Sequence, residues 1–206
     1  MQADFSIELG RDDHALEVPW ASPDGTQRYL NLKRQPELLL HVLEATDNRE
    51  LAEFLVALNA PQSSLETAKC DTWLSNEIHP EEEIFGAPWK FGSYVDVLFT
   101  DLTHRAVLKL HEELVRGITA LLKRAPDFAA SADFVVRRCY THLHVNPDNS
   151  ADPDTSEDGY CITLYVSGFG DDEADARKNW VIGLKVVQNA LMQAVAQQQR
   201  RATGPA

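Results

Sequence analysis

The sequence has few of the features that assign a chain to a specialised class. No apolar run is long enough for a signal sequence or a membrane span, and residues 1–4 contain no basic side chain, so we expect a cytoplasmic protein. Cysteine is scarce: Cys70, Cys139 and Cys161 form an odd set without CxxC spacing. That pattern favours reduced thiols over a disulfide framework or a zinc site.

Basic residues are also in deficit. There are 19 Lys and Arg against 32 Asp and Glu, which gives a net charge of −13. This charge opposes the phosphate attraction that drives non-specific nucleic-acid binding, so we expect neither a nucleic-acid nor a membrane partner. A basic protein partner is compatible with it, and an acidic inhibitor such as an immunity protein against a toxin fits the charge and size. Acidity is equally a general means of staying soluble.

Familiar catalytic and cofactor motifs are missing. There is no G-x-S-x-G, Walker or H-E-x-x-H sequence, and residues 166–170 lack the third glycine of a nucleotide-binding turn, which Glu173 replaces. The acidic loop around residues 148–158 fails the calcium-loop pattern because Pro153 or Glu157 takes the glycine position. The sequence leaves enzymatic activity open, favours a non-catalytic protein and indicates no cofactor apart from the metal pair considered below.

The chain does have enough apolar content for a sizeable core, with 44% hydrophobic residues in 206. We expect one compact domain over residues 1–206. Its parts are N-terminal strands with a helical pair (1–60), two further segments (61–125 and 126–200) and a tail (201–206). The first part contains three short extended candidates, FSIEL, ALEVPW and RYLNL, and helices that begin near Pro36 and Asn48.

The two later segments resemble each other. The sequence KCDTWL from Lys69 matches RCYTHL from Arg138 at the cysteine, threonine, leucine and basic positions, and GSYVDVLF from Gly92 aligns with GYCITLYV from Gly159. A helical pattern follows each pair. We therefore predict an α+β fold with tandem ββα units at 65–124 and 133–200, and an antiparallel sheet with helices packed on one face.

Alternation within the second strand of each unit predicts which side chains face the helices. The apolar residues Val95, Val97 and Phe99, and Ile162, Leu164 and Val166, should meet the helices. In the strand around Cys139 both faces are mixed. If Cys139 and Thr141 point toward the helices, the opposite face gathers aromatic and titratable groups: Asp71, Trp73, Tyr94, Asp96, Arg138, Tyr140, His142, His144, Thr163 and Tyr165.

Three interpretations of that face are open: a second core layer covered by residues 1–60, a dimer interface, or a ligand groove. His142 and His144, two residues apart on a strand, could hold a divalent metal if Asp71 or Asp96 supplied a third ligand. We expect a non-catalytic binding or self-assembling module that uses the aromatic face or the acidic loops with a protein partner or a second copy. The alternative is a small-molecule or metal-dependent enzyme around Tyr140, His142 and His144, with Asp71 or Asp96 as acid–base partner.

Overall fold

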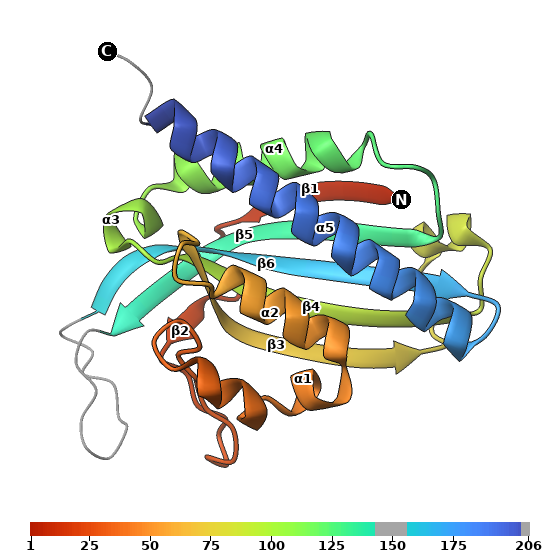
Figure 1. The fold of residues 1–206 in the computed structure, drawn as a ribbon, viewed down its shortest axis with the longest axis horizontal. Helices are drawn as coiled ribbons and strands as arrows, with labels where there is room; N and C mark the ends of the chain where they lie inside the picture. Colours follow the sequence, from red (N-terminus) through yellow and green to blue (C-terminus); the bar gives the residue numbers. More distant parts are fainter. Residues whose placement is uncertain (143–155, 203–206) are drawn as a thin grey trace.

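A computed structural model describes residues 1–142 and 156–202 and shows a six-stranded sheet with helices packed on one of its faces (Figure 1). The strand order is β1-β5-β6-β4-β3, with β2 also paired to β5. The predicted α+β class is therefore confirmed. We call the side of the sheet that carries the helices the inner face and the opposite side the outer face.

Four long strands form the antiparallel centre of the sheet: β3 (Leu65–Ser75), β4 (Trp89–Phe99), β5 (Ala130–His142) and β6 (Ser156–Gly170). Each hairpin pairs internally, β3 with β4 and β5 with β6, and β4 pairs with β6 where the hairpins meet. Alternating apolar side chains explain this arrangement, because every second residue of β4 and β6 enters the core.

The N-terminal strands depart from the expected antiparallel pattern. β1 (Gln2–Glu8) and β2 (Leu16–Val18) both run parallel to β5 along its outer edge, so the sheet is mixed. The third extended candidate, RYLNL, is not a strand; only Arg28 makes an isolated bridge, to Ala21. This parallel pairing joins segments more than a hundred residues apart, and a local sequence pattern does not predict such a pairing.

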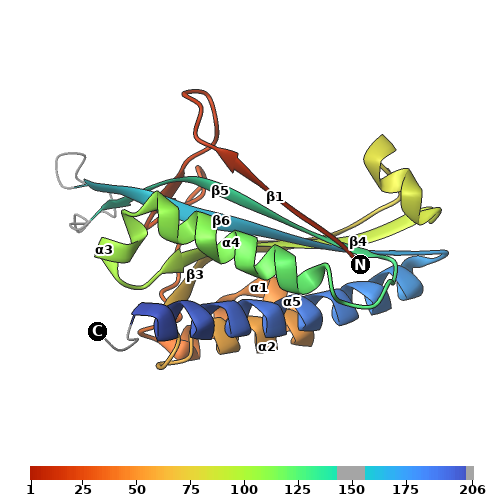
Figure 2. The ribbon, with the colours of Figure 1, turned by 90° about the horizontal axis from the view of Figure 1, so that it is seen from above.

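The helices lie over the inner face (Figures 1 and 2). The first expected helix of the N-terminal pair is divided into a 3₁₀ turn, η1 (Pro36–His41), and α1 (Leu43–Asp47), and the second is α2 (Arg49–Leu58). The predicted helix after β4 is also divided, into α3 (Leu102–Arg105) and α4 (Leu108–Leu122). The closing helix is α5 (Glu173–Ala202), which includes the first residues of the expected tail.

The core lies between these helices and the sheet. The predicted apolar stripe of α5 is confirmed, because Trp180, Leu184, Val187, Leu191 and Val195 are all buried. Trp180 also donates a hydrogen bond from its indole to Ser93 Oγ of β4 at 2.9 Å. Gly168 lets α5 approach β6 closely: a Cβ there would lie 2.0 Å from the Trp180 backbone nitrogen.

The element order contains two hairpins that are each followed by helices, but internal duplication stays a prediction. Cys70 and Cys139, which the sequence alignment equates, lie on opposite faces. Cys70 packs against the inner core, whereas Cys139 belongs to a small outer cluster. A bulge in β3 between Thr67 and Cys70 shifts the register at this point.

Candidate functional site

The outer face of β4 and β6 carries the side chains that the alternation predicts. Tyr94 pairs with Tyr165 across these strands, with ring centroids 6.0 Å apart, and Asp96 pairs with Thr163. Thr163 Oγ1 donates a 2.6 Å hydrogen bond to Asp96 Oδ1. The aliphatic partners Val95, Val97, Ile162 and Leu164 lie in the inner core, so this part of the prediction is confirmed.

One end of the outer face is covered by the segment that follows β2. Val18 packs with Ala68, Leu98, Cys139 and Cys161 in a second, smaller apolar cluster, against which Leu16 and Tyr29 also pack. The Trp20 indole donates to the Ala68 carbonyl at 2.8 Å, which fixes the segment to β3. The interpretation in which residues 1–60 cover the outer face therefore applies only at this end (Figure 2).

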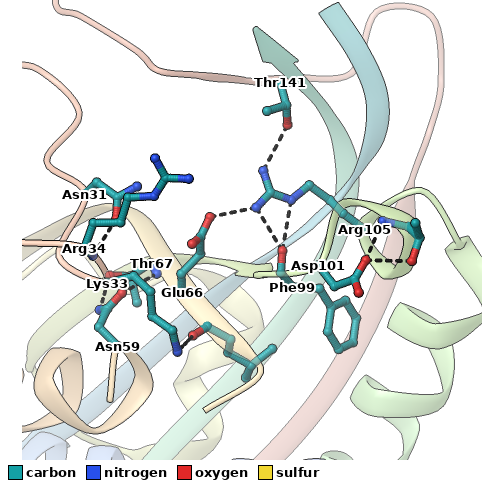
Figure 3. Close-up of polar contacts among 12 residues, drawn as sticks. Asn31, Lys33, Arg34, Asn59, Glu66, Thr67, Phe99, Asp101, Arg105 and Thr141 are labelled. Carbon is teal, nitrogen blue, oxygen red and sulfur yellow. Dashed lines mark hydrogen bonds and ion pairs between the residues drawn. The ribbon is translucent and has the colours of Figure 1, made fainter. Parts of the chain in front are cut away.

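Arg105 of α3 makes a group of polar contacts at the same end (Figure 3). Its guanidinium is bonded to Glu66 of β3 at 2.7 Å, to the Phe99 carbonyl of β4 and to Thr141 Oγ1 of β5. The Arg105 and Glu66 residues are only 4% and 9% exposed. Because this ion pair and its hydrogen bonds join three strands, it fixes the geometry of the covered end.

The opposite end is covered by a second 3₁₀ turn, η2 (Pro80–Phe85). Phe85 stacks on Phe169 with ring centroids 4.1 Å apart, and Lys90 forms a 2.8 Å ion pair with Glu82. In the described part of the chain, no helix or strand lies over the middle of the outer face, between η2 and the segment after β2 (Figure 2).

We call this middle region the open strip. Its central row crosses five strands in register. It also includes Trp73, whose indole lies over Gly92, and the Asp96–Thr163 pair. The residues of the central row, in order from β3 to β1, are Asp71, Tyr94, Tyr165, Asp133 and Asp4.

The open strip is acidic and its acids are not neutralised. Within residues 1–142 and 156–202, none of Asp4, Asp71, Asp96 and Asp133 forms an ion pair. The nearby cation of Arg137 is committed to Glu8 at 3.1 Å. Neighbouring like charges on paired strands are unfavourable for folding, so the pairing of Asp4 with Asp133 lowers the stability of the fold.

Burial changes the acid–base properties of the strip. Desolvation raises the pKa of Asp96 above its ordinary value, against the opposing hydrogen bond from Thr163 and the charges of Arg137 and Lys69. Desolvation, followed by the charges of Asp4 and Glu82, also raises the pKa of Asp133. The pKa of Tyr94 is raised by desolvation and by Asp96 and Asp71, so its hydroxyl remains protonated at neutral pH.

A cavity of about 650 Å³ opens at the edge of β3 beside the bulge. Its volume lies within the range of about 300–1,000 Å³ that is typical of ligand sites. Asp71 and Tyr94 belong both to this cavity and to the open strip, so the two are continuous. The other polar or aromatic lining residues include Trp20, His41, Glu44 and Lys69.

The strand around Cys139 faces the other way from the expectation. Cys139 pairs with Gly159 and packs in the outer cluster, so Arg138, Tyr140 and His142, which alternate with it, lie on the inner side of β5. Both faces of β5 carry apolar residues, since Val135 and Val136 are both buried, and the alternation was therefore ambiguous. These three residues do not join the open strip.

The proposed metal pair is not assembled in the described residues. His142 lies 4.0 Å from Glu17, and its ring nitrogens are buried without a hydrogen bond, while His144 lies outside the described residues. In the two described ranges there is no group of three or more His, Cys, Asp or Glu residues that could hold a metal ion. Asp71 and Asp96, the suggested third ligands, lie on the opposite face of the sheet from His142.

The cysteines are not activated as nucleophiles. Burial raises the pKa of Cys70 to about 12 and that of Cys139 to about 11, and it also raises the pKa of Cys161. The thiolate is the reactive form of cysteine, and burial favours the thiol form of all three side chains at neutral pH.

Sequence reasoning missed Asp133 and Asp4, which extend the acidic row across β5 and β1. Neither residue belongs to a motif, and only the parallel register of β1 brings them together. Of the residues expected on the outer face, the structure does gather Asp71, Trp73, Tyr94, Asp96, Thr163 and Tyr165.

Comparisons of the chain with protein-family models, with curated proteins and with solved structures found no match. Among the described helices, none combines the length and apolar character that crossing a membrane requires.

Proposed function

We propose that the protein is a non-catalytic binding module that uses the open strip. More particularly, its partner is a basic segment of another protein, which lies across the strip between η2 and the segment after β2. The observation that carries the proposal is the row of acids and rings from Asp71 to Asp4, whose carboxylates have no ion-pair partner among the residues that the structure describes.

Physical chemistry favours this interpretation over a second core layer. A layer that served packing alone would bury its rings, yet Tyr94 and Tyr165 remain partly exposed and Asp71 and Asp133 are exposed. Tyrosines with carboxylates beside them provide apolar area, hydrogen bonds and charge for a cationic surface. Charge complementarity of this kind increases the association rate and selects the sign of the partner.

Site-specific photocrosslinking tests the proposal. A benzoylphenylalanine residue is placed at Tyr165 in the open strip or, as the matched control, at Tyr140 on the inner side of β5, and the cells that naturally contain the chain are irradiated. We expect a covalent adduct with a basic protein from position 165 and none from position 140. Asp133→Lys in the same chain should abolish the adduct, because it reverses one charge of the row.

Absence of an adduct from position 165 would contradict the proposal. An adduct with a second copy of this chain would replace the basic partner with self-assembly through the same surface. Equal labelling from positions 165 and 140 would mean that the open strip has no special role.

A further inference from the structure

We propose that the open strip contains a receptor for one guanidinium group, an arginine side chain of the partner, with Asp96, beside the central row, as its acceptor. This inference rests on the proposed function and specifies the chemical group that the strip selects. It follows from the surroundings of the Asp96 carboxylate and of the two tyrosine rings in the adjacent row.

Asp96 is a buried acid whose carboxylate is only partly satisfied by hydrogen bonds. The residue is 7% exposed, and only Oδ1 accepts a hydrogen bond, from Thr163 at 2.6 Å. Within the described residues no donor reaches Oδ2. That oxygen is not among the unpaired atoms that are fully enclosed, so it keeps a small exposed area. A buried charge without a cation is unfavourable for folding, and a ligand cation that pairs with it recovers that loss.

The cations nearest to Asp96 are held by other groups. Lys69 Nζ lies 5.1 Å from the centre of the Trp20 ring, in a cation–π contact. Arg137 is bonded to Glu8 at 3.1 and 3.2 Å and reaches the Tyr165 hydroxyl at 3.4 Å. Neither forms an ion pair with Asp96, so no cation of residues 1–142 and 156–202 occupies the acceptor site.

The rings beside Asp96 suit a guanidinium better than an ammonium. Tyr94 and Tyr165 occupy the adjacent row with an interplanar angle of 48°. The Arg137 guanidinium already lies over the Tyr165 ring, 6.0 Å from its centroid, so Tyr94 is the ring on which a flat cation from a partner would stack. Guanidinium is planar, weakly hydrated and carries five donors, whereas ammonium is a compact and strongly hydrated charge. Asp71, next to Tyr94 in the same row, supplies a second carboxylate.

The experiment measures binding of N-acetylarginine amide to the intact protein by NMR of the tyrosine rings. N-acetylcitrulline amide, which has the same shape without the charge, and N-acetyllysine amide are the controls. We expect arginine amide to bind in the millimolar range and both controls to bind roughly tenfold more weakly. Asp96→Asn should weaken arginine amide roughly tenfold, whereas the matched strip variant Asp133→Asn should change its affinity by only about twofold.

The carboxyl carbon signal of Asp96 gives a readout that requires no variant. Saturating arginine amide should lower the pKa of Asp96, because the cation favours the charged form, and affinity should rise with pH until the acid is fully ionised. The titratable or charged residues that bear on this carboxyl are Lys69, Cys70, Tyr94, Arg137, Cys139 and Cys161.

An unchanged Asp96 pKa, or equal affinities for arginine and citrulline amides, would overturn the receptor. Equal affinity for lysine amide would overturn its selectivity for guanidinium. These outcomes are separate from failure of the proposed function, because a crosslink from position 165 that survives in Asp96→Asn would leave the basic partner in place without this receptor.

Discussion

Removal of the Arg105 guanidinium should destabilise the protein mainly through the charge that it leaves behind. In Arg105→Met, Glu66 keeps its buried position but loses its only ion-pair partner among the described residues. Breaking a buried pair by removing one member costs about 3–5 kcal/mol, because the remaining charge is uncompensated. A loss of this size is a large fraction of the about 5–15 kcal/mol that stabilises a typical domain.

The double variant Arg105→Met with Glu66→Met separates this charge from the other effects. Both variants lose the same hydrogen bonds to the Phe99 carbonyl and Thr141, so the difference between them reports Glu66 alone. Replacement of both partners by apolar residues is often close to neutral, and we expect the double variant to recover about 2 kcal/mol or more relative to the single one.

Urea unfolding followed by tryptophan fluorescence measures these free energies, with equal m-values as the check on two-state behaviour. Buried Trp180 makes the signal sensitive to loss of the core. If the double variant is as unstable as Arg105→Met, the reasoning is refuted, and the lost hydrogen bonds rather than the isolated carboxylate dominate. A cost below about 1 kcal/mol for the single variant would show that the pair behaves as a surface salt bridge.

Two further predictions concern Asp96 and the close contact of α5 with the sheet. Folding raises the pKa of Asp96, so its ionisation opposes folding increasingly as pH rises from the unfolded-state pKa through the folded-state pKa. The difference in unfolding free energy between Asp96→Asn and wild type, measured by urea titration, should therefore increase from about pH 3.5 to about pH 7. A difference that does not change with pH would contradict this prediction. Gly168→Ala should cost about 3 kcal/mol or more, because the new Cβ meets the backbone of α5. The helical control Gly117→Ala, whose Cβ would lie 3.7 Å from Ala194, should instead stabilise by about 0.5–1 kcal/mol in thermal or urea unfolding.

The parts of the fold that could be predicted from the sequence are those specified by local periodicity. In β4 and β6 one set of alternating residues is aliphatic and the other is polar or aromatic, so the side facing the helices could be assigned. α5 has a long apolar stripe and an acidic first turn with Glu173 and Asp175, which favours a helix N-terminus.

The parts that could not be predicted depend on pairing between distant segments. β5 carries apolar residues on both faces, so its sequence does not specify which set faces the helices. The assumption that Cys139 faces the helices therefore assigned Arg138, Tyr140 and His142 to the outer face, whereas they lie on the inner face. Asp4 and Asp133 become neighbours only through the parallel ladder between β1 and β5. The acidic row is thus a property of the register, which the order of residues along the chain does not reveal.

The same parallel ladder constrains how the chain acquires its structure during translation. Residues 2–8 pair with residues 131–137, so β1 cannot form its backbone hydrogen bonds to β5 until more than a hundred later residues have left the ribosome. Contacts over such long separations slow folding and prolong the exposure of unpaired strand edges. The acidic row is consequently incomplete in every nascent chain that ends before β5, and its contribution from Asp4 is acquired only after most of the sheet has been synthesised.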